Sequence, residues 1–280
     1  MRLETYAKLS AVESATDKST ERSFPRKAGV ASGPRRNGVM QNGLYVSLSA
    51  QVALERRLET IADNVANMNT VGYRATGVSF ETEVAKAGDA RLGYASSGSD
   101  FISRRLGGLT KTDNSLDFAV QGDGWFGIQT PQGVAYTRDG RVQIDESGTL
   151  RTMSGDPLLD AGGAPMLVDS AAGPLTVSAD GMITQNGRQV GAIGLFTIDP
   201  AANLKRAENS SVVPDKPATP VLDFTRDGVV QGAVEGSNVD PVREMTRLIE
   251  VTRAFDGVAA ETSQSETSLQ DAIKALGASA

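Results

Sequence analysis

The side chains best suited to chemistry in this sequence are two closely spaced pairs of carboxylates, Asp145-Glu146 and Asp113/Asp117. Two carboxylates can cleave a glycosidic bond when one donates a proton and the other acts as base or nucleophile. Acids that precede Ser147-Gly148, however, more often form a turn than a catalytic pair. We therefore predict no catalytic residue. The alternative to a protein without catalytic residues belongs to another functional class: a secreted protein that binds cell wall or processes carbohydrate.

The composition removes most other chemistry. The 280 residues include no histidine and no cysteine. These absences exclude a disulfide framework, a Cys/His metal site and a nucleophile activated by histidine. Any acid–base catalyst would have to be a carboxylate, lysine or tyrosine. The sequence thus favours a protein that is not an enzyme and has no cofactor or metal.

Glycine-containing motifs offer two further ligand sites, and neither is convincing. The run Gly122–Gly127 has neither the spacing nor the Lys-Ser/Thr ending of a phosphate-binding loop. Several Asx-Gly dipeptides could surround calcium, but they lack the spaced ligands of an EF-hand. They predict hairpin turns instead, and we expect no small-molecule substrate. The dipeptides are Asp123-Gly124, Asp139-Gly140, Asp180-Gly181, Asn186-Gly187 and Asp227-Gly228.

Charge divides the chain into two unlike parts. Residues 1–39 carry eight basic and four acidic side chains, whereas residues 40–280 carry 20 basic and 30 acidic ones. The acidic body argues against a nucleic-acid partner. No apolar run approaches the roughly 20 residues of a membrane-spanning helix, so we expect no membrane span.

Residues 1–39 are rich in Ser, Thr, Arg and Lys, and they have few large apolar side chains. Such a segment buries too little surface to offset its ordering entropy, so we predict a disordered extension. One reading is a basic arm or targeting peptide. The other is an upstream extension from a misplaced start codon, which the strong pattern that opens at Met40 favours. Residues 1–39 lack the apolar segment of a secretory signal.

Apolar side chains recur at helical spacing near both ends of the chain. In residues 40–70 they are separated by four, three, four and three positions, which predicts one apolar helix face. Residues 238–280 continue the same spacing after Asp240-Pro241, a capping pair that predicts a helix start. The N-terminal set is Leu54, Leu58, Ile61, Val65 and Met68, and the C-terminal set is Met245, Leu248, Thr252, Phe255, Ala259, Thr262, Glu266, Leu269, Ile273 and Leu276.

The middle of the chain alternates with period two, which predicts a central antiparallel β domain over residues 116–237. Residues 71–115 are rich in Gly and Ser and predict an extended connector, and prolines in 199–220 argue against regular structure there. The expected fold is therefore α+β or mainly β, with the terminal helices packed as a coiled-coil-like pair. Candidate strands are 116–121, 125–129, 134–137, 141–145, 149–152, 174–178, 182–185, 189–198 and 221–225.

The helical faces allow two readings. They could pair with each other inside one monomer, or they could join subunits. Terminal helices that must meet across a long insert suit a filament, in which head-to-tail contacts do not close. We expect the contacts within and between subunits to use Leu54, Leu58, Ile61, Val65, Met68, Met245, Leu248, Phe255, Leu269, Ile273 and Leu276.

Four ordered motifs resemble those of the flagellar rod and hook protein family. The run 62–74 is similar to the family's N-terminal signature, with Arg74 where Lys is usual. The runs 116–126 and 136–140 resemble its central motifs, and Gly236-Ser-Asn-Val239 resembles its C-terminal signature. The resemblance covers residues 40–277. The motif residues are Asn64, Ala66, Asn67, Asn69, Thr70, Gly72, Tyr73, Gly236, Ser237, Asn238 and Val239.

The resemblance implies a structural subunit of the basal-body rod that polymerises with itself and with other rod subunits. It also implies export by the flagellar type III apparatus without a cleaved signal peptide, and assembly in the periplasm into a shaft needed for swimming. The opening Gln41–Gln51, the ending Ser268–Ile273 and the 241 residues from Met40 look most like proximal-rod members of alphaproteobacterial type. A distal rod or hook-type subunit is the alternative within the family.

Overall fold

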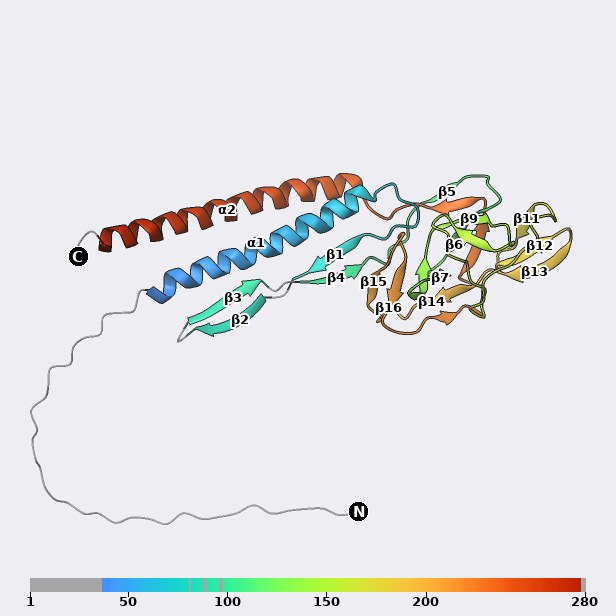
Figure 1. Cartoon of the computed structure of the whole chain (residues 1–280), viewed down its shortest axis with the longest axis horizontal. Coiled ribbons are helices and arrows are strands. Elements are labelled where there is room, and N and C mark those ends of the chain that lie inside the picture. Colours follow the sequence, from blue (N-terminus) through green and yellow to red (C-terminus); the bar gives the residue numbers. More distant parts are fainter. Residues whose placement is uncertain (1–36, 81, 88–89, 96–97, 278–280) are drawn as a thin grey trace, which may run out of the picture. The chain divides into compact units, whose positions relative to one another are not determined.

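The computed structural model describes residues 37–80, 82–87, 90–95 and 98–277 (Figure 1). The predicted extension at residues 1–39 falls almost entirely outside this part of the chain. The described residues place one helix before and one helix after a series of antiparallel strands. This order confirms the predicted mixed α+β class, with a β region inserted between terminal helices. Residues from Val39 onward form one compact unit.

The first helix, α1, spans Asn37–Ala66. It ends four residues before the predicted end at residue 70, because the next residues form turns. Asn67 closes the last turn, where its amide N–H donates to the Asp63 carbonyl and its side-chain amide donates to the same carbonyl. Two further turns, Met68 N to Val65 O and Thr70 N to Asn67 O, lead the chain out of the helix.

The last helix, α2, spans Pro241–Gly277 and begins where the sequence predicts. The Asp240 carboxylate accepts hydrogen bonds from the amides of Val242 and Arg243, as expected of a residue that caps a helix N-terminus. Among the described residues, no helix combines the length and the apolar character that a membrane crossing requires.

The strands begin earlier in the chain than the sequence indicates. The segment 71–115, predicted as an extended connector, contains two short hairpin-like pairs and one further strand. The pair β1–β4 encloses the pair β2–β3, and β5 follows (Figure 1). These strands could not be recognised in the sequence, because Gly and Ser do not produce an alternation of apolar and polar side chains. The strands are β1 Thr76–Ser79, β2 Thr82–Ala87, β3 Ala90–Ala95, β4 Ser99–Ile102 and β5 Leu109–Lys111.

The β region proper follows the predicted strands closely up to residue 192, and all its pairings are antiparallel. One sheet has the order β10-β9-β6-β18, a second β11-β12-β13, a third β15-β16-β8-β7-β14-β17, and β19 pairs with β5. The strands are β6 Asp117–Gln121, β7 Trp125–Thr130, β8 Gly133–Thr137, β9 Gly140–Ile144, β10 Leu150–Thr152, β11 Leu175–Val177, β12 Met182–Gln185, β13 Arg188–Ala192, β14 Leu195–Thr197, β15 Leu204–Arg206, β16 Val212–Pro214, β17 Thr219–Pro220, β18 Gly228–Gln231 and β19 Ala233–Glu235.

Several strand predictions are wrong after residue 189. The predicted strand 189–198 is two strands, because β13 ends before Gly194, whose N–H donates to the Leu159 carbonyl. The predicted strand 221–225 is a turn in which the Asp223 carboxylate accepts the Thr225 amide. The proline-rich stretch 199–220 nevertheless contains β15, β16 and β17. Its strand prolines stand at strand ends, where a missing N–H is tolerated.

Two of the five Asx-Gly dipeptides form the predicted hairpin turns. Asp180-Gly181 joins β11 to β12, and Asn186-Gly187 joins β12 to β13. Asp123-Gly124 and Asp139-Gly140 instead carry the chain from one sheet to another. Asp227-Gly228 leads into β18, and its carboxylate accepts the amides of Asp123 and Gly124.

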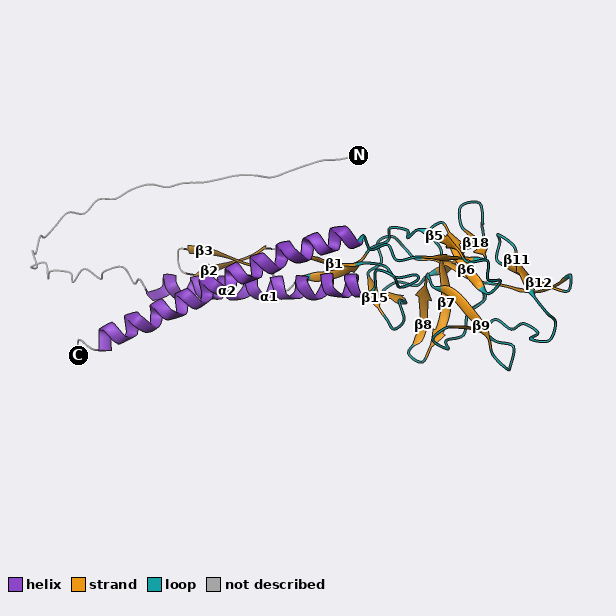
Figure 2. Ribbon diagram, turned by 90° about the horizontal axis from the view of Figure 1, so that it is seen from above, coloured by secondary structure: helices purple, strands orange, loops and turns teal. Residues whose placement is uncertain are grey.

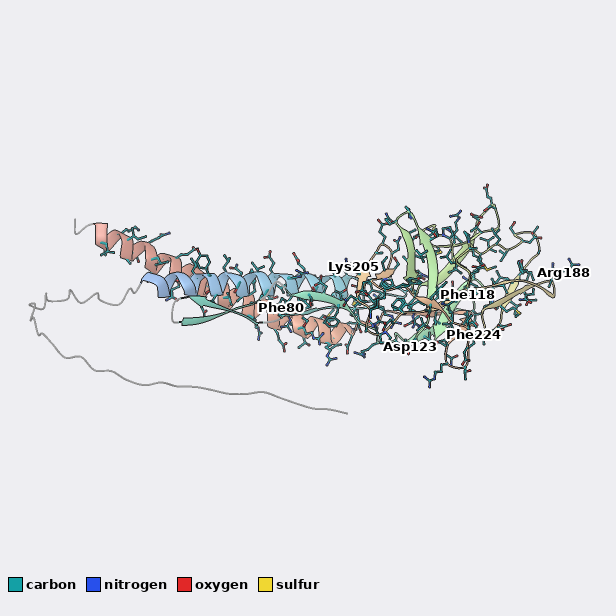
Figure 3. The ribbon with its side chains drawn as sticks, turned by 90° about the horizontal axis from the view of Figure 1, so that it is seen from below. Phe80, Phe118, Asp123, Arg188, Lys205 and Phe224 are labelled. Atoms are coloured by element: carbon teal, nitrogen blue, oxygen red, sulfur yellow. The ribbon has the colours of Figure 1, made fainter. Side chains whose placement is uncertain are left out.

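Two buried apolar clusters hold the β region together. The larger cluster lies between the four-, three- and six-stranded sheets and includes Phe118, Phe126 and Ile183, all fully buried. The smaller one surrounds Trp125, Tyr136 and Phe196, with Tyr136 and Phe196 in edge-to-face contact at 5.5 Å between ring centroids. Figure 2 shows this strand-rich region distinct from the two helices, and Figure 3 labels Phe118 within it.

Gly140 provides a test of this packing. A Cβ atom at residue 140 would lie 1.9 Å from the Phe118 carbonyl oxygen, and backbone cannot move aside cheaply. We expect Gly140→Ala to lower the free energy of unfolding by about 2 kcal/mol or more. Urea denaturation, followed by the fluorescence of Trp125, measures this because Trp125 is the only tryptophan.

Gly108→Ala is the matched control, since nothing lies within 4 Å of a Cβ built there. Its unfolding free energy should stay within about 0.5 kcal/mol of the wild-type value. If both substitutions changed the free energy of unfolding equally, the close approach of the Phe118 backbone would not be the reason that residue 140 is glycine.

Candidate functional site: the junction of the terminal helices with the β region

The end of α1 and the start of α2 both lie next to the β region (Figures 1 and 2), and the residues of the N- and C-terminal motifs meet there. Asn64, in the last turn of α1, is buried and binds the backbone of the first strand. Its amide donates to the Thr76 carbonyl at 2.8 Å, and its oxygen accepts the Thr76 N–H at 2.9 Å. This two-point contact fixes the direction in which the chain leaves the helix.

Gly72 brings the N-terminal motif against β19, the last strand of the β region. Its φ of +69° is unfavourable for other residues, and a Cβ atom would lie 2.3 Å from the Asp139 amide nitrogen. Its own N–H donates to the Glu235 carbonyl at 2.7 Å. Residue 72 must therefore be glycine for α1 to approach β19 so closely.

Tyr73 is buried beside Gly72 and is covered by an arginine. The Arg206 guanidinium carbon lies 4.3 Å from the centre of the Tyr73 ring, a cation–π distance. Arg206 also donates to the Arg74 carbonyl and to Thr76 Oγ1. Burial raises the pKa of the Tyr73 hydroxyl, so the ring stays neutral here.

Asn238 supplies the matching contact from the C-terminal motif. Its oxygen accepts the Ala75 N–H at 2.7 Å, and its amide donates to the Arg105 carbonyl at 2.7 Å. Its backbone N–H donates to the Tyr73 carbonyl at 3.2 Å. One side chain thus joins the segment after α1, the segment after β4 and the approach to α2.

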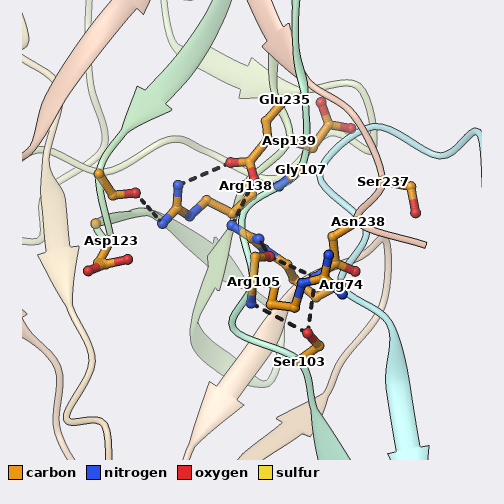
Figure 4. A network of polar contacts seen from close by, with 12 residues as sticks. Arg74, Ser103, Arg105, Gly107, Asp123, Arg138, Asp139, Glu235, Ser237 and Asn238 are labelled. Carbon is orange, nitrogen blue, oxygen red and sulfur yellow. Dashed lines mark hydrogen bonds and ion pairs between the residues drawn. The ribbon is translucent and has the colours of Figure 1, made fainter. Parts of the chain in front are cut away.

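A buried carboxylate between two arginines forms the centre of the junction (Figure 4). Glu235 Oε1 lies 2.8 Å from Arg74 Nη2, and Glu235 Oε2 lies 3.0 Å from Arg138 Nη1. The three side chains are only 1–2% exposed. Gly107 N–H also donates to Oε1 at 2.7 Å. Glu235 therefore connects four segments that are far apart in the sequence.

This group carries one more positive than negative charge, and backbone carbonyls and an aromatic ring contact its guanidinium groups. Arg74 donates to the Arg105 carbonyl, and Arg138 donates to the Gly122 carbonyl at 2.8 Å. Both guanidinium groups lie over Trp125, with ring-centre distances of 5.5 and 5.2 Å. Burial lowers the pKa of Arg138 to about 10, while Glu235 opposes the shift. Arg138 thus remains charged at neutral pH.

The other motif residues lie around this centre. Thr70 Oγ1 donates to the Asn67 oxygen, and the Gly236 N–H donates to the Gly108 carbonyl. The Val239 N–H donates to Ser237 Oγ, and the Val239 side chain is buried. Ala66 and Asn69 are exposed.

The predicted assembly residues are distributed unevenly. The α1 residue Ile61 is buried, and four of the others in the N-terminal set are half-buried. Of the six predicted assembly residues in α2, three are half-buried and three are exposed. The half-buried side chains are Leu54, Leu58, Val65, Met68, Leu248, Phe255 and Leu269, and the exposed ones are Met245, Ile273 and Leu276.

Space remains between the helices and the first strands. A cavity of about 170 Å³ is lined by Ile61 and Asn64 of α1, Phe101 of β4 and Glu244 of α2. A second cavity of about 410 Å³ adjoins α1 and Asp100. Only Glu244 and Val251 of α2 are buried.

The carboxylates considered for catalysis have structural contacts. Asp145 Oδ1 accepts hydrogen bonds from the amides of Ser147 and Thr149, and its other oxygen binds Arg151. The hydrogen bond from the Ser147 hydroxyl to Oδ1, together with these bonds, holds the pKa of Asp145 far below its usual range and assigns it a turn role. Asp117 accepts a hydrogen bond from Asn114. Within the described ranges, no three acidic side chains are grouped to hold a metal ion.

Sequence reasoning missed the central carboxylate. Arg74 and Arg138 lie inside recognised motifs, but Glu235 stands one residue before the C-terminal motif. An acid that ends an apolar strand next to such a motif is the one signal that could have revealed it. The departure from Lys at residue 74 is also explained, because the fork of Arg74 binds Glu235 and the Arg105 carbonyl together.

Removing the charge of Glu235 tests the junction. Glu235→Gln would leave two buried guanidinium groups without their counterion, which typically costs about 3–5 kcal/mol. We expect that loss in the free energy of unfolding, together with a shifted Trp125 emission in the folded protein, since both arginines contact the indole.

Lys216→Met is the control, because Lys216 and Asp199 form an ion pair that is nearly half exposed. Exposed pairs contribute about 0–1 kcal/mol. A Glu235→Gln protein as stable as the control would contradict a supporting role for the buried group.

Comparison with known proteins gives three family-model matches that follow the architecture. Residues 44–74 match the flagella basal body rod protein model, which covers α1 from Leu44 onward and the turn to Arg74. Residues 119–185 match the flagellar hook protein FlgE/F/G D1 domain, and residues 230–275 match the flagellar basal body rod FlgEFG protein C-terminal model. The first and third matches contain the two halves of the junction.

Three relatives are similar along nearly their whole length, and each is called flagellar basal-body rod protein FlgF. The protein of Mesorhizobium japonicum is 53% identical over 238 residues, which are 85% of this chain and 99% of the relative. That of Rhizobium meliloti is 50% identical over 86% of this chain and 100% of its own. That of Caulobacter vibrioides is 36% identical over 85% and 99%. The chain therefore belongs to the flagellar basal-body rod protein family and is similar to its FlgF members over almost their full length.

Proposed function

We propose that this protein is a structural subunit of the proximal rod of the flagellar basal body, where it polymerises with itself and with other rod subunits. The observation that carries the proposal is the exposure of large apolar side chains along both terminal helices. Tyr45, Leu48 and Val52 of α1 are 50–59% exposed, and Val242, Ile273 and Leu276 of α2 are 68–76% exposed. A single chain leaves these faces uncovered.

The spacing of the exposed side chains suits helix packing. Tyr45, Leu48 and Val52 are separated by three and four residues, so they form one stripe on α1. At 1.5 Å per residue, α2 is about 55 Å long, yet it has only two buried residues. A long helix in water gains most of its stability from packing of such a stripe. Neighbouring subunits are the partners that cover it.

The residues expected to join subunits keep that role in this proposal. Ile61 lines the cavity beside α2, and the half-buried state of Leu54, Leu58, Val65 and Met68 leaves area for a neighbour. The coiled-coil-like pairing of α1 with α2 forms when subunits assemble and close that space. Each large aliphatic side chain that becomes buried contributes about 1.5–3 kcal/mol, so a few per interface suffice.

The junction gives the subunit a mechanical role. A rod transmits torque only if its subunits do not shear internally. Glu235, Asn64 and Asn238 fix the helix ends to the β region by charged and two-point hydrogen bonds. Torque carried by the helices would thus reach the β region without a flexible link.

The proposal includes export through the flagellar type III apparatus and assembly in the periplasm, without a cleaved signal peptide. Export requires unfolding, and the sparsely buried helices open at low free-energy cost. The chain contains no cysteine, so no disulfide has to be broken.

A charge on the exposed face of α2 tests the proposal. Ile273 is 68% exposed, so Ile273→Asp should leave the unfolding free energy within about 0.5 kcal/mol. In a strain that lacks the wild-type gene, the same substitution should abolish swimming, because a carboxylate would be buried between subunits. Swimming in soft agar and basal bodies seen by electron microscopy are the measurements.

Gln264→Asp is the matched control. It lies nine residues before Ile273, half a turn away around the helix, and is also exposed. The control strain should swim. Normal rods and swimming with Ile273→Asp would argue against assembly through this face, and normal swimming of the deletion strain would refute the rod function altogether.

A further inference from the structure

A groove of about 330 Å³ lies on the β region. Its rim combines apolar and acidic side chains from three separate turns and strands. Val134 of β8 and Val213 of β16 are each 41% exposed. The lining residues are Thr130, Gln132, Gly133, Val134, Asp156, Ala207, Glu208 and Val213.

The groove exists because two neighbouring strands separate. β8 and β16 share a single pairing, Val212 with Tyr136, although both strands continue beyond it. Val134 pairs with Gln129 and Val213 with Lys205, but neither has a partner across the gap between β8 and β16. An apolar side chain from outside would fit between them.

The acidic side of the groove lacks a counterion. Burial raises the pKa of Asp156, and the nearby charge of Glu208 raises it further. Arg151 lowers it, but the Arg151 guanidinium is already bound to Asp145. Among the described residues, none donates a hydrogen bond to the Asp156 carboxylate, which lines the groove. A cation that entered would relieve the repulsion between the two acids.

A matching surface occurs on the same chain at the β12–β13 hairpin. Arg188, Gln189 and Val190 follow its turn and are all exposed. A bulge between Ile183 and Thr184 leaves Val190 without a partner across the hairpin. β13 is the edge strand of its sheet, and within the described part of the chain Arg188 has no ion-pair partner.

The two surfaces are separated on one molecule. Figure 3 labels Arg188 at the end of the β region opposite to Lys205, which belongs to the strand that leads into Ala207 and Glu208. The hairpin therefore does not reach the groove of its own chain. A contact between them requires two copies, and it is head-to-tail.

We propose that the β12–β13 hairpin of one copy docks into the groove of a second copy, with Arg188 between Asp156 and Glu208 and Val190 against Val134 and Val213. The pairing matches one cation with two carboxylates and one exposed aliphatic side chain with two others. Because the two faces differ, each copy can bind the next, and the contact repeats along a helical row. The inference rests on the proposed rod function and adds a contact between β regions.

Cysteine cross-linking tests the contact, because the natural chain contributes no thiol. The full-length double variant Gln189→Cys/Gln132→Cys is expressed in the deletion strain, the cells are oxidised, and the products are separated on a non-reducing gel. We expect bands at two, three and more times the monomer mass. Each single-cysteine variant, which lacks the thiol on the other face, should remain monomeric.

Charge reversal in the double-cysteine protein tests the predicted ion pairs. Arg188→Glu and Glu208→Arg should each lower the cross-linked fraction about tenfold, the loss expected for one charge-assisted hydrogen bond. The combination of both reversals should restore it. Arg226→Glu, at an exposed site outside both surfaces, should have no effect.

Monomer alone, or a product at the mass of another protein, in cells that swim and build rods would overturn the contact while leaving the rod function intact. If the introduced cysteines prevent assembly, the two charge reversals are tested in the chain without cysteine, and motility is the measurement. Swimming lost with Arg188→Glu and regained with both reversals supports the contact, and unchanged swimming with Arg188→Glu overturns it. Normal swimming of the deletion strain would instead reject the rod function.

Discussion

A single carboxylate that neutralises two buried guanidinium groups is the interaction on which the described structure depends. Glu235 ends the last strand, Arg74 follows the first helix, and Arg138 lies in the middle of the β region. Ions removed from water are stable only when geometry and hydrogen bonds replace their hydration. Trp125 and two backbone carbonyls supply part of that replacement, while Arg74 Nε and Arg138 Nε have no hydrogen-bond partner. This group, together with the contacts of Asn64 and Asn238, attaches the helix ends to the strands.

Beyond this attachment, the single chain is only partly stabilised. The β region has two apolar clusters of its own, whereas α2 buries two side chains in 37 residues. The two halves thus obtain stability from different sources. Burial inside the subunit maintains the strands, and burial between subunits is available to the helices. This division suits a rod subunit whose proposed export precedes its assembly.

Prediction from the sequence is most accurate where a few neighbouring residues determine the local structure. Asp240-Pro241 specifies a helix start by capping, and the two-residue turn at Asn186-Gly187 specifies a hairpin. Asp139-Gly140 has the same local signal but serves as a crossing between sheets, because Phe118 and Phe126 lie against Gly140. Glu235 could not be predicted, since its partners are 97 and 161 residues earlier and charges at such separations leave no periodicity. The α2 faces were predicted as one apolar seam, yet Leu269 is half-buried while Ile273 and Leu276 are exposed.

The hydrogen bond from the Gly72 N–H to the Glu235 carbonyl also makes the β region an insertion whose two ends touch. Beyond β1–β4, which lie beside α1, the chain leaves the helical framework and returns to it at this point. Loops such as Asp160–Ala164 can therefore lengthen or shorten in evolution without moving either helix. The outer surface of the subunit can diverge between lineages while the helical part remains interchangeable, and this freedom lets related subunits specialise within one shaft.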